Sequence, residues 1–186
     1  MATEAEDVLP TVLSGWEDYQ ISLLRTIAPR TSAELCWRPA PHLRSAGEVA
    51  AHIIRGRIQW FHYVLGEGEG ELAGDADADL TTWMSRQGLE ERTADLVSGL
   101  EASWRLVIGT LQRSTRANLA QIAPTPPYKG QTYALTRQWI VWHVLAHDLH
   151  HGGELALTFG LQGITLPELG GEGGHLAERA PLTESS

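Results

Sequence analysis

One long apolar segment, Trp139–Phe159, constrains this chain more than any other feature of its sequence. The segment contains no proline, and Gly160 follows it directly. Its composition predicts a long helix from about Thr136 to Phe159, with Gly160 at the C′ position, where glycine commonly ends a helix. Within it lies the histidine-rich string 147–151, HDLHH. Imidazole rings in such apolar surroundings are costly to bury unless they have partners.

His147 and His151 lie four residues apart, so a helix would place them on one face. Side chains at i and i+4 are neighbours, with Cβ atoms about 5–6 Å apart, and two imidazoles at that distance can bind one metal ion at about 2.0–2.1 Å per nitrogen. Imidazole suits zinc, nickel, copper and iron better than calcium or magnesium. The same spacing also occurs on helices that bind no metal, so a metal site requires a third ligand.

Helical spacing of apolar residues predicts three further long helices. They span about Glu4–Ala28, Ala46–Leu65 and Leu89–Asn118. Capping-box patterns at Thr31–Glu34 and Ser45–Glu48 predict a short helical turn and the start of the second long helix. No strand pattern competes with these elements. The expected fold class is therefore all-α, a four-helix bundle formed by residues 1–165.

The segments between and after these helices lack the apolar spacing of a core element. The acidic, Gly-rich stretch Gly66–Asp79 is expected to be a flexible loop, and residues 166–186 are expected to form a Gly-rich polar tail. Pro124, Pro126 and Pro127 predict an irregular crossing before the last helix. The length of 186 residues suits a single domain with one core.

The charge balance excludes several classes of partner. The chain has 14 basic and 23 acidic residues, a net charge of −9, and a single lysine, Lys129. A protein that binds the phosphate backbone needs a basic face, and an anionic membrane surface attracts basic segments. We therefore expect no nucleic acid and no membrane among its partners.

The first residues and the cysteine count indicate a cytoplasmic location. The N-terminus is acidic and lacks a basic and apolar leader, so no signal peptide is predicted. The single cysteine, Cys36, excludes an internal disulfide, which fits a reducing compartment. We expect Cys36 to be a small buried apolar residue rather than a nucleophile.

His52 is the candidate third ligand. It lies on the second predicted helix, among Val49, Ile53 and Trp60. Facing helices of a bundle lie about 8–10 Å apart, which allows His52 to meet His147 and His151. Three protein ligands leave a coordination position open, as in catalytic metal sites. A core histidine that hydrogen-bonds to a neighbour is the alternative for His52 alone.

Three pieces of the sequence, taken in order, carry a family resemblance. The first is Leu35–Pro41 followed by Arg44–His52, which leads into the second helix. The second is the acidic linker with the long third helix. The third is Trp142–Leu155, in which a His-x-x-x-His pair is followed by glycine. Together they resemble the DinB/YfiT-like family of small helical metalloproteins, over about residues 5–165.

The resemblance implies that His52, His147 and His151 bind a divalent metal ion, usually zinc or nickel, and that the protein is a homodimer. It also implies a low-molecular-weight thiol, such as bacillithiol or mycothiol, as a cosubstrate. The chain departs from the family pattern at Gly152, where arginine is common, and at Glu154, where glutamine is common. The ligands are unaffected, but the polar rim that would meet a thiol or substrate is altered, because arginine often contacts a carboxylate there.

Other polar residues near the predicted site are candidates for supporting roles. Glu154 is expected to hydrogen-bond the ligands, and Asp148 either to do the same or to be solvated. His143, one turn before His147, is expected to line the site or to replace His147 as a ligand. No catalytic residue is assigned. The remaining histidines are expected to face away from the site or to lie in loops: His42, His62 and His150.

Two other metalloprotein classes share part of this pattern. The string 147–151 mimics the zinc-protease motif His-Glu-x-x-His with Asp in place of Glu, but the chain offers only His175, in the polar tail, as a downstream ligand. A di-iron bundle needs Glu-x-x-His motifs on two helices. The one such string, Glu172–His175, lies in the same tail, so neither class is favoured.

With the resemblance, the sequence favours a metal-dependent thiol S-transferase that acts on a small electrophile. A metal-dependent hydrolase, with water in place of the thiol, is the close alternative. A non-catalytic metal-binding stress-response protein is the alternative from a different class. The homodimer is expected to pair the first and third predicted helices, with Trp16 and Trp104 as aromatic anchors or as core residues of one chain.

Overall fold

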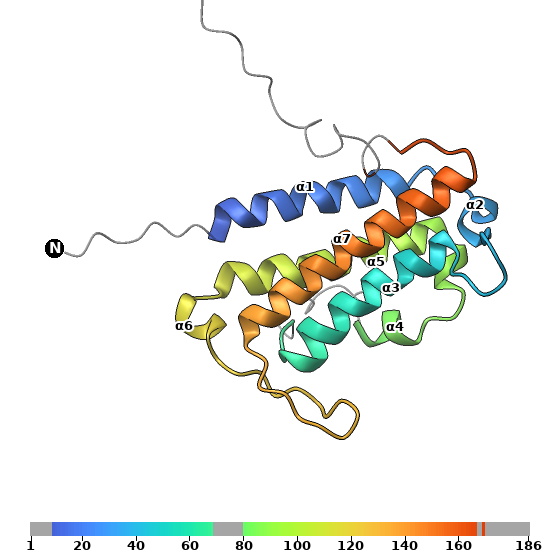
Figure 1. Ribbon diagram of the computed structural model, residues 1–186. Coiled ribbons are helices and arrows are strands. Elements are labelled where there is room, and N and C mark those ends of the chain that lie inside the picture. The colour runs from blue at the N-terminus through green and yellow to red at the C-terminus, as the bar shows by residue number, and fades with distance from the viewer. Residues whose placement is uncertain (1–8, 69–79, 167–168, 170–186) are drawn as a thin grey trace, which may run out of the picture.

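Four long helices lie side by side in the protein (Figure 1). Their bounds are α1 (Leu9–Ile27), α3 (Ala46–Ile58), α5 (Thr93–Arg113) and α7 (Arg137–Leu161). The computed structural model describes residues 9–68, 80–166 and 169. Within that part of the chain, extended pairing is limited to isolated bridges, Ile122 with Thr136 and Tyr128 with Gln131. The predicted all-α fold is therefore confirmed.

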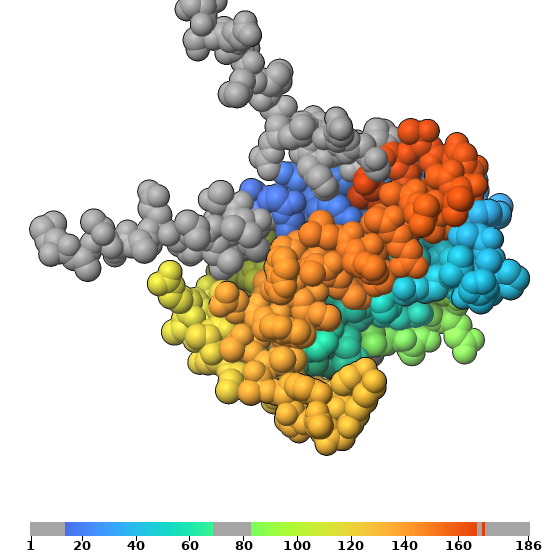
Figure 2. Space-filling view, in the orientation of Figure 1, coloured from blue at the N-terminus to red at the C-terminus, as the bar shows by residue number. Residues whose placement is uncertain are grey.

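The helix α3 holds the bundle together, because it packs against both α5 and α7, whereas α1 packs against α5. The helices meet through fully buried apolar side chains such as Leu23, Ile54, Leu100 and Val144. In the space-filling view, the surface of α7 (orange) runs beside that of α3 (teal) (Figure 2). The functional residues described below lie along this α3–α7 seam.

Trp16 and Trp104 are core residues of one chain. Their rings meet edge to face, with centroids 5.5 Å apart, and both side chains are buried or nearly so. Burial of both rings within the bundle rules out the expectation that they anchor a dimer interface, since an anchor must be reachable from a second chain.

Both predicted capping boxes are present. Thr31 Oγ1 accepts a hydrogen bond from the Glu34 N–H and opens the short helix α2 (Ser32–Cys36). Ser45 Oγ accepts from the Glu48 N–H in the same way and opens α3. Cys36 is exposed, so the prediction of a buried cysteine is wrong. The reason is that α2 is a single turn that buries Leu35 and leaves its last residue outside.

The second predicted helix changes its winding before it ends. α3 passes into a π-helical turn, η1 (Gln59–Val64), and the Leu65 N–H bonds to the Trp60 carbonyl, five residues back. Such turns are rare and occur frequently at functional sites. The apolar spacing predicted an uninterrupted helix to Leu65, because the extra residue of a π turn leaves little trace in that spacing.

The third predicted helix, Leu89–Asn118, is divided in the structure. After α4 (Leu80–Ser85), a 3-10 turn η2 (Leu89–Glu91) precedes α5, and α6 (Arg116–Leu119) follows it. The helix α5 ends before Ser114, whose backbone is extended. The hydroxyl of Thr115 then accepts a hydrogen bond from the Asn118 N–H and caps α6. A capping residue thus starts a new helix where a continuous one was predicted.

The helix α7 runs past its predicted end and includes Gly160. Its C-cap is Gln162, and Gly163 follows with a φ of +78°, in the left-handed region that favours glycine. The prediction that Gly160 ends the helix is therefore wrong. Gly163, three residues farther along, is the glycine that follows the end of the helix.

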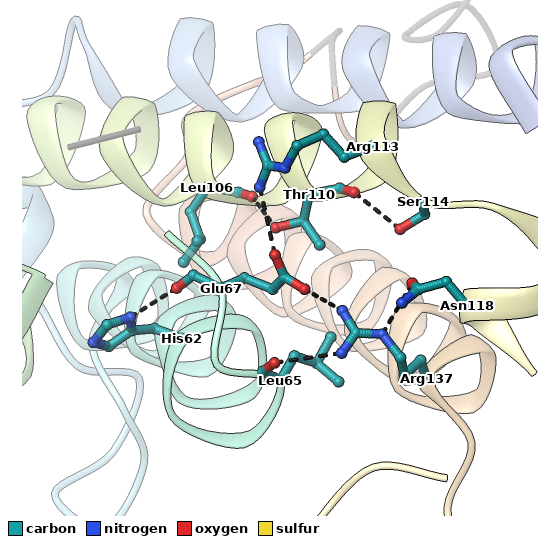
Figure 3. Close-up of polar contacts among 9 residues, drawn as sticks. All are labelled: His62, Leu65, Glu67, Leu106, Thr110, Arg113, Ser114, Asn118 and Arg137. Atoms are coloured by element: carbon teal, nitrogen blue, oxygen red, sulfur yellow. Dashed lines mark hydrogen bonds and ion pairs between the residues drawn. The ribbon is translucent and has the colours of Figure 1, made fainter. Parts of the chain in front are cut away.

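Glu67 fixes the chain directly after η1 (Figure 3). Its carboxylate pairs with Arg137 at the start of α7 and with Arg113 at the end of α5, where Nη2 lies 3.4 Å from Oε2. Its carbonyl oxygen lies 2.8 Å from His62 Nδ1. The first residues of the predicted loop Gly66–Asp79 are therefore held by α5 and α7, and residues 69–79 lie outside the described residues.

None of the helices that the structure describes is long and apolar enough to cross a membrane. The polar tail predicted for residues 166–186 lies almost entirely outside the described residues, and so do Glu172 and His175. The structure therefore bears on the bundle and not on the predicted tail.

Candidate metal centre

Three histidines from two helices meet at the α3–α7 seam. His52 comes from α3, and His147 and His151 come from successive turns of α7. The Nε2 atoms of His52 and His147 lie 3.0 Å apart. One donor nitrogen from each of the three rings lies within 4.8 Å of the others. The structure thus brings together the three residues that the sequence predicted as ligands.

The spacing of these nitrogens fits a divalent metal ion. Two nitrogens bound to one ion at about 2.0–2.1 Å lie about 2.8–3.4 Å apart for N–metal–N angles between 90° and the tetrahedral value. The Nε2 distance of 3.0 Å between His52 and His147 falls in that range. Two neutral imidazoles at this distance share either a proton or a cation, and three rings around one point favour the cation.

Gly56 makes room for one of the ligands. It lies one turn after His52 on α3, and a Cβ built on it would come within 2.7 Å of His147 Cε1. Any side chain here would therefore push the His147 ring away from His52. The close approach of α3 to α7 depends on this glycine.

Glu154 orients His151. Its Oε2 lies 2.8 Å from His151 Nδ1, so this nitrogen carries the proton and Nε2 is left to bind a metal. Arg44, in the loop before α3, pairs with the same Oε2 at 3.2 Å. A carboxylate that hydrogen-bonds the outer nitrogen of a ligating histidine fixes its ring and raises its basicity, and Glu154 has this position.

Asp148 lies behind the ligands in a fully buried ionic network. Its Oδ2 accepts hydrogen bonds from Arg57 Nε and from Trp16 Nε1, both at 2.9 Å, and Arg57 Nη2 lies 2.8 Å away. Arg57 Nη1 in turn donates to Gln20 Oε1 at 2.7 Å. The network ties α1, α3 and α7 together directly beneath His147.

Two opposing effects act on the Asp148 carboxylate. Burial alone would raise its pKa, but the charge of Arg57 and hydrogen bonds from His147, Arg57 and Trp16 outweigh burial and lower the pKa below the ordinary value. The His147 ring lies close to the carboxylate, although neither His147 Nδ1 nor Asp148 Oδ1 makes a hydrogen bond of normal geometry with the described residues. Asp148 is therefore a carboxylate that holds the core around His147, rather than a solvated group.

Two of the three histidines, His52 and His151, have lowered pKa values that favour the neutral form needed for metal binding. Burial, with the neighbouring rings of His147 and His151 and the charge of Arg44, lowers the pKa of His52 to about 4. Burial likewise lowers the pKa of His151, although the hydrogen bond to Glu154 opposes it. Neutral imidazole is the form that ligates metals, so these nitrogens remain available in mildly acidic solution.

The lowered pKa of His52 predicts how the metal-free protein responds to acid. An unfolded histidine takes up a proton near pH 6.5, whereas folded His52 does so near pH 4. Between these values the unfolded state binds more protons, so the free energy of unfolding should fall as the pH drops from about 6.5 to 4. Urea titrations of chelator-treated protein at several pH values would measure this slope.

Two single substitutions test whether His52 is the source of this pH dependence of stability. His52→Gln should reduce the dependence of stability on pH, whereas His42→Gln, at an exposed loop position, should leave it unchanged. An equal slope in wild-type protein and His52→Gln would contradict the assignment.

His143 lies beside the three histidines without joining them. Its ring stacks on Trp139, with centroids 5.0 Å apart and planes 7° apart, and meets Trp60 edge-on at 4.9 Å. Its centroid is 6.3 Å from that of His147. His143 thus packs between Trp139 and Trp60, and His147, not His143, is the residue that the structure groups with His52 and His151.

His150 and His62 do not belong to the three-histidine group, although the His150 ring meets that of His151 edge to face with centroids 4.9 Å apart. His150 is exposed, although it forms a second cluster of possible donors with His151 and Glu154. This second cluster would compete with Arg44 for Glu154 and offers one exposed ring, so the three-histidine group is the better site. His62 contacts the Glu67 carbonyl, as described above.

Tyr19 explains the departure from the family pattern at Gly152. A Cβ built on Gly152 would lie 1.6 Å from Tyr19 Oη and 2.7 Å from Cζ. The Tyr19 hydroxyl donates to the Leu149 carbonyl at 3.5 Å, and burial, followed by the charge of Asp148, raises its pKa to about 12. A neutral tyrosine from α1 therefore occupies the space beside α7, and no side chain fits at position 152.

Comparison with known proteins assigns the family. The model of the DinB superfamily matches residues 18–155, so the chain belongs to this superfamily. The fold resembles the crystal structure of a DinB-like protein from Bacillus cereus ATCC 10987, with a TM-score of 0.62 and 19% identity. The likeness covers 83% of this chain and 93% of that one. A comparison with curated protein sequences gives no match.

Arg57, Tyr19 and Arg44 are the site residues that sequence reasoning missed. An arginine in a helix is ordinarily solvated, so the burial of Arg57 has no signal in the local sequence. Tyr19 lies on a helix far along the chain from Gly152, and only the empty position at Gly152 hinted at a bulky neighbour. Arg44 directly precedes the cap of α3, where the sequence pattern concerned Ser45 alone.

Proposed function

We propose that the protein binds one divalent metal ion through His52, His147 and His151 and is a metal-dependent S-transferase. It would join a low-molecular-weight thiol to a small electrophile. The observation that carries the proposal is the convergence of three imidazole nitrogens, two of them 3.0 Å apart. Three ligands leave coordination positions free for a substrate, as in catalytic zinc sites.

When bound, a divalent ion supplies Lewis acidity, which lowers the pKa of a thiol or water that it coordinates. The chain's own residues prepare the site for it. Glu154 keeps the proton of His151 on Nδ1, so that Nε2 faces the centre. Gly56 allows His147 to approach His52. The buried pair of Arg57 and Asp148 fixes the turn of α7 that carries His147.

Two alternatives use the same residues. A metal-dependent hydrolase would employ water in place of the thiol, and a non-catalytic metal-binding protein would need no substrate. The partial exposure of His52 and His147 supports a site that a small molecule can reach, and a purely structural zinc site normally has four protein ligands. The transferase is therefore favoured over a closed structural site.

Metal analysis combined with thiol consumption tests the proposal. Purified protein should contain close to one zinc or nickel ion per chain, and consume bacillithiol or mycothiol in the presence of a small electrophile. His52→Ala, His147→Ala and His151→Ala should each remove most of the bound metal and the activity. His62→Ala and His42→Ala are the matched controls and should retain both.

Circular dichroism of the same variants separates loss of metal from loss of fold. The four long helices supply a core without metal, unlike zinc fingers, whose folding depends on the ion. The alanine variants and chelated wild-type protein should therefore keep their helical spectrum and lose only thermal stability. Full metal content in His147→Ala would contradict the proposed ligand set, and thiol consumption without metal would contradict the mechanism.

We also propose that the protein is a homodimer. The sequence predicted a contact between the first and third long helices, but several large apolar side chains are exposed along α7 instead, and a twofold contact there would cover them. They are Trp142, Leu149, Leu157 and Leu161. Light scattering at micromolar concentration should give about twice the chain mass of 20.4 kDa. A mass near that of one chain would contradict the dimer and leave the metal site unaffected.

A further inference from the structure

Arg44 presents a cation at the edge of the three-histidine group. It directly precedes Ser45, the capping residue of α3, so its backbone is fixed by the start of that helix. Its side chain is 41% exposed, and Nη2 lies 3.2 Å from Glu154 Oε2. The same oxygen accepts from His151 Nδ1 at 2.8 Å. Arg44 is therefore joined to a proposed metal ligand through one carboxylate.

The contact with Glu154 leaves much of the guanidinium available. Arginine has five N–H donors in a planar fork, and the hydrogen bond to Glu154 uses only Nη2. A solvent-exposed ion pair is weak, so an incoming anion can share or replace Glu154 at little cost. The contact with Glu154 itself shows that the Arg44 guanidinium can bind a carboxylate in this position.

The surroundings make Arg44 the cation that an anionic ligand would meet. Tyr19 fills the space beside Gly152, so α7 carries no side chain there. The chain has a net charge of −9 and offers no general attraction to anions. A ligand that carries a carboxylate and also reaches the three histidines therefore depends on a local positive charge.

We propose that Arg44 binds the carboxylate of the thiol substrate, so that the site prefers carboxylate-bearing thiols to uncharged ones. This inference rests on the proposed function, in which a thiol binds at the metal. A planar, bidentate contact would orient the thiol through a group remote from its sulfur, as arginine commonly does for carboxylates. Arg44 is thus a specificity residue rather than a catalytic one.

An isosteric pair of thiols tests the preference. Protein loaded with Co²⁺ is titrated with 3-mercaptopropionate and with 3-mercaptopropanamide, and the near-ultraviolet absorption of cobalt-bound thiolate gives the Kd of each. The measured quantity is the ratio of the two Kd values, which cancels general effects on metal content. Arg44→Gln should reduce the preference for the carboxylate about tenfold, and Arg44→Lys should restore part of it.

Arg38→Gln is the matched control. Arg38 is 42% exposed and pairs with Glu48, just as Arg44 is 41% exposed and pairs with Glu154. The control should keep the wild-type ratio. An unchanged ratio in Arg44→Gln, or an equal fall in Arg38→Gln, would overturn the proposal while leaving thiol binding intact. Absence of the absorption with both thiols in wild-type protein would overturn the proposed function and this inference with it.

Discussion

Replacement of Arg57 by methionine is expected to lower the free energy of unfolding by about 3–5 kcal/mol, because it leaves a buried carboxylate without its counter-ion. Both side chains of the Arg57–Asp148 pair are completely buried. Methionine fills much of the volume of arginine, so the effect reports charge rather than a cavity. Trp16 Nε1 alone cannot neutralise the Asp148 charge.

Thermal and urea unfolding of four variants, Asp148→Asn among them, would isolate the contribution of the buried ion pair to stability. Arg57→Met should lower the Tm by roughly 6–20 °C for a chain of this size. Arg57→Met combined with Asp148→Asn should be less destabilised than the two single variants added together, since no charge is left unpaired. Arg38→Met removes an exposed ion pair with Glu48 and should cost less than about 1 kcal/mol. A cost that small in Arg57→Met would show that the buried pair is dispensable.

The three-histidine group was the part of the site most accessible from sequence. His147 and His151 share a helix, so their separation depends only on helical geometry, which is local. His52 required one further step, since its position follows from the distance between packed helices and from an apolar stripe that fixes which face of α3 looks inward. Both steps use regular periodicity, and both led to residues that the structure brings together.

The helix boundaries show where periodicity fails. Both capping boxes were predicted because their chemistry lies within four residues. The π turn at Gln59–Val64 was not, because it shifts the register by one residue without changing the composition. The break at Ser114 was missed for a related reason. The stripe of α5 and the cap of α6 each look regular, and only the extended backbone between them separates the two helices.

Contacts that join distant helices lie beyond local reasoning altogether. Arg57 is buried because Asp148 and Gln20, from two other helices, accept its hydrogen bonds. The local sequence around any one of these residues does not predict that Arg57 is buried. Cys36 gives the opposite error, since a residue type that is usually buried lies at the exposed end of a single-turn helix. In each case a tertiary contact, or its absence, decides against the preference of the residue type.

Gly152 and Gly153 offer the sharpest test of such a contact, because adjacent positions on one helix should respond to the same change with opposite sign. Alanine is about 0.8–1 kcal/mol better than glycine in a helix interior. At Gly153 an added Cβ meets nothing within 4 Å, so Gly153→Ala should stabilise the protein by about 0.4–1 kcal/mol. At Gly152 the Cβ would lie 1.6 Å from Tyr19 Oη, and overpacking of this kind costs about 1–3 kcal/mol.

A second background assigns the clash to Tyr19. Tyr19→Leu removes Cζ and Oη, the two atoms nearest to the added Cβ. Gly152→Ala should therefore be much less harmful in Tyr19→Leu than in wild-type protein, and urea unfolding of the four proteins in this cycle measures the difference. If Gly152→Ala is as stable as Gly153→Ala in the wild-type background, the tyrosine yields easily. The absence of a family arginine at position 152 would then need another cause than the space that α1 fills.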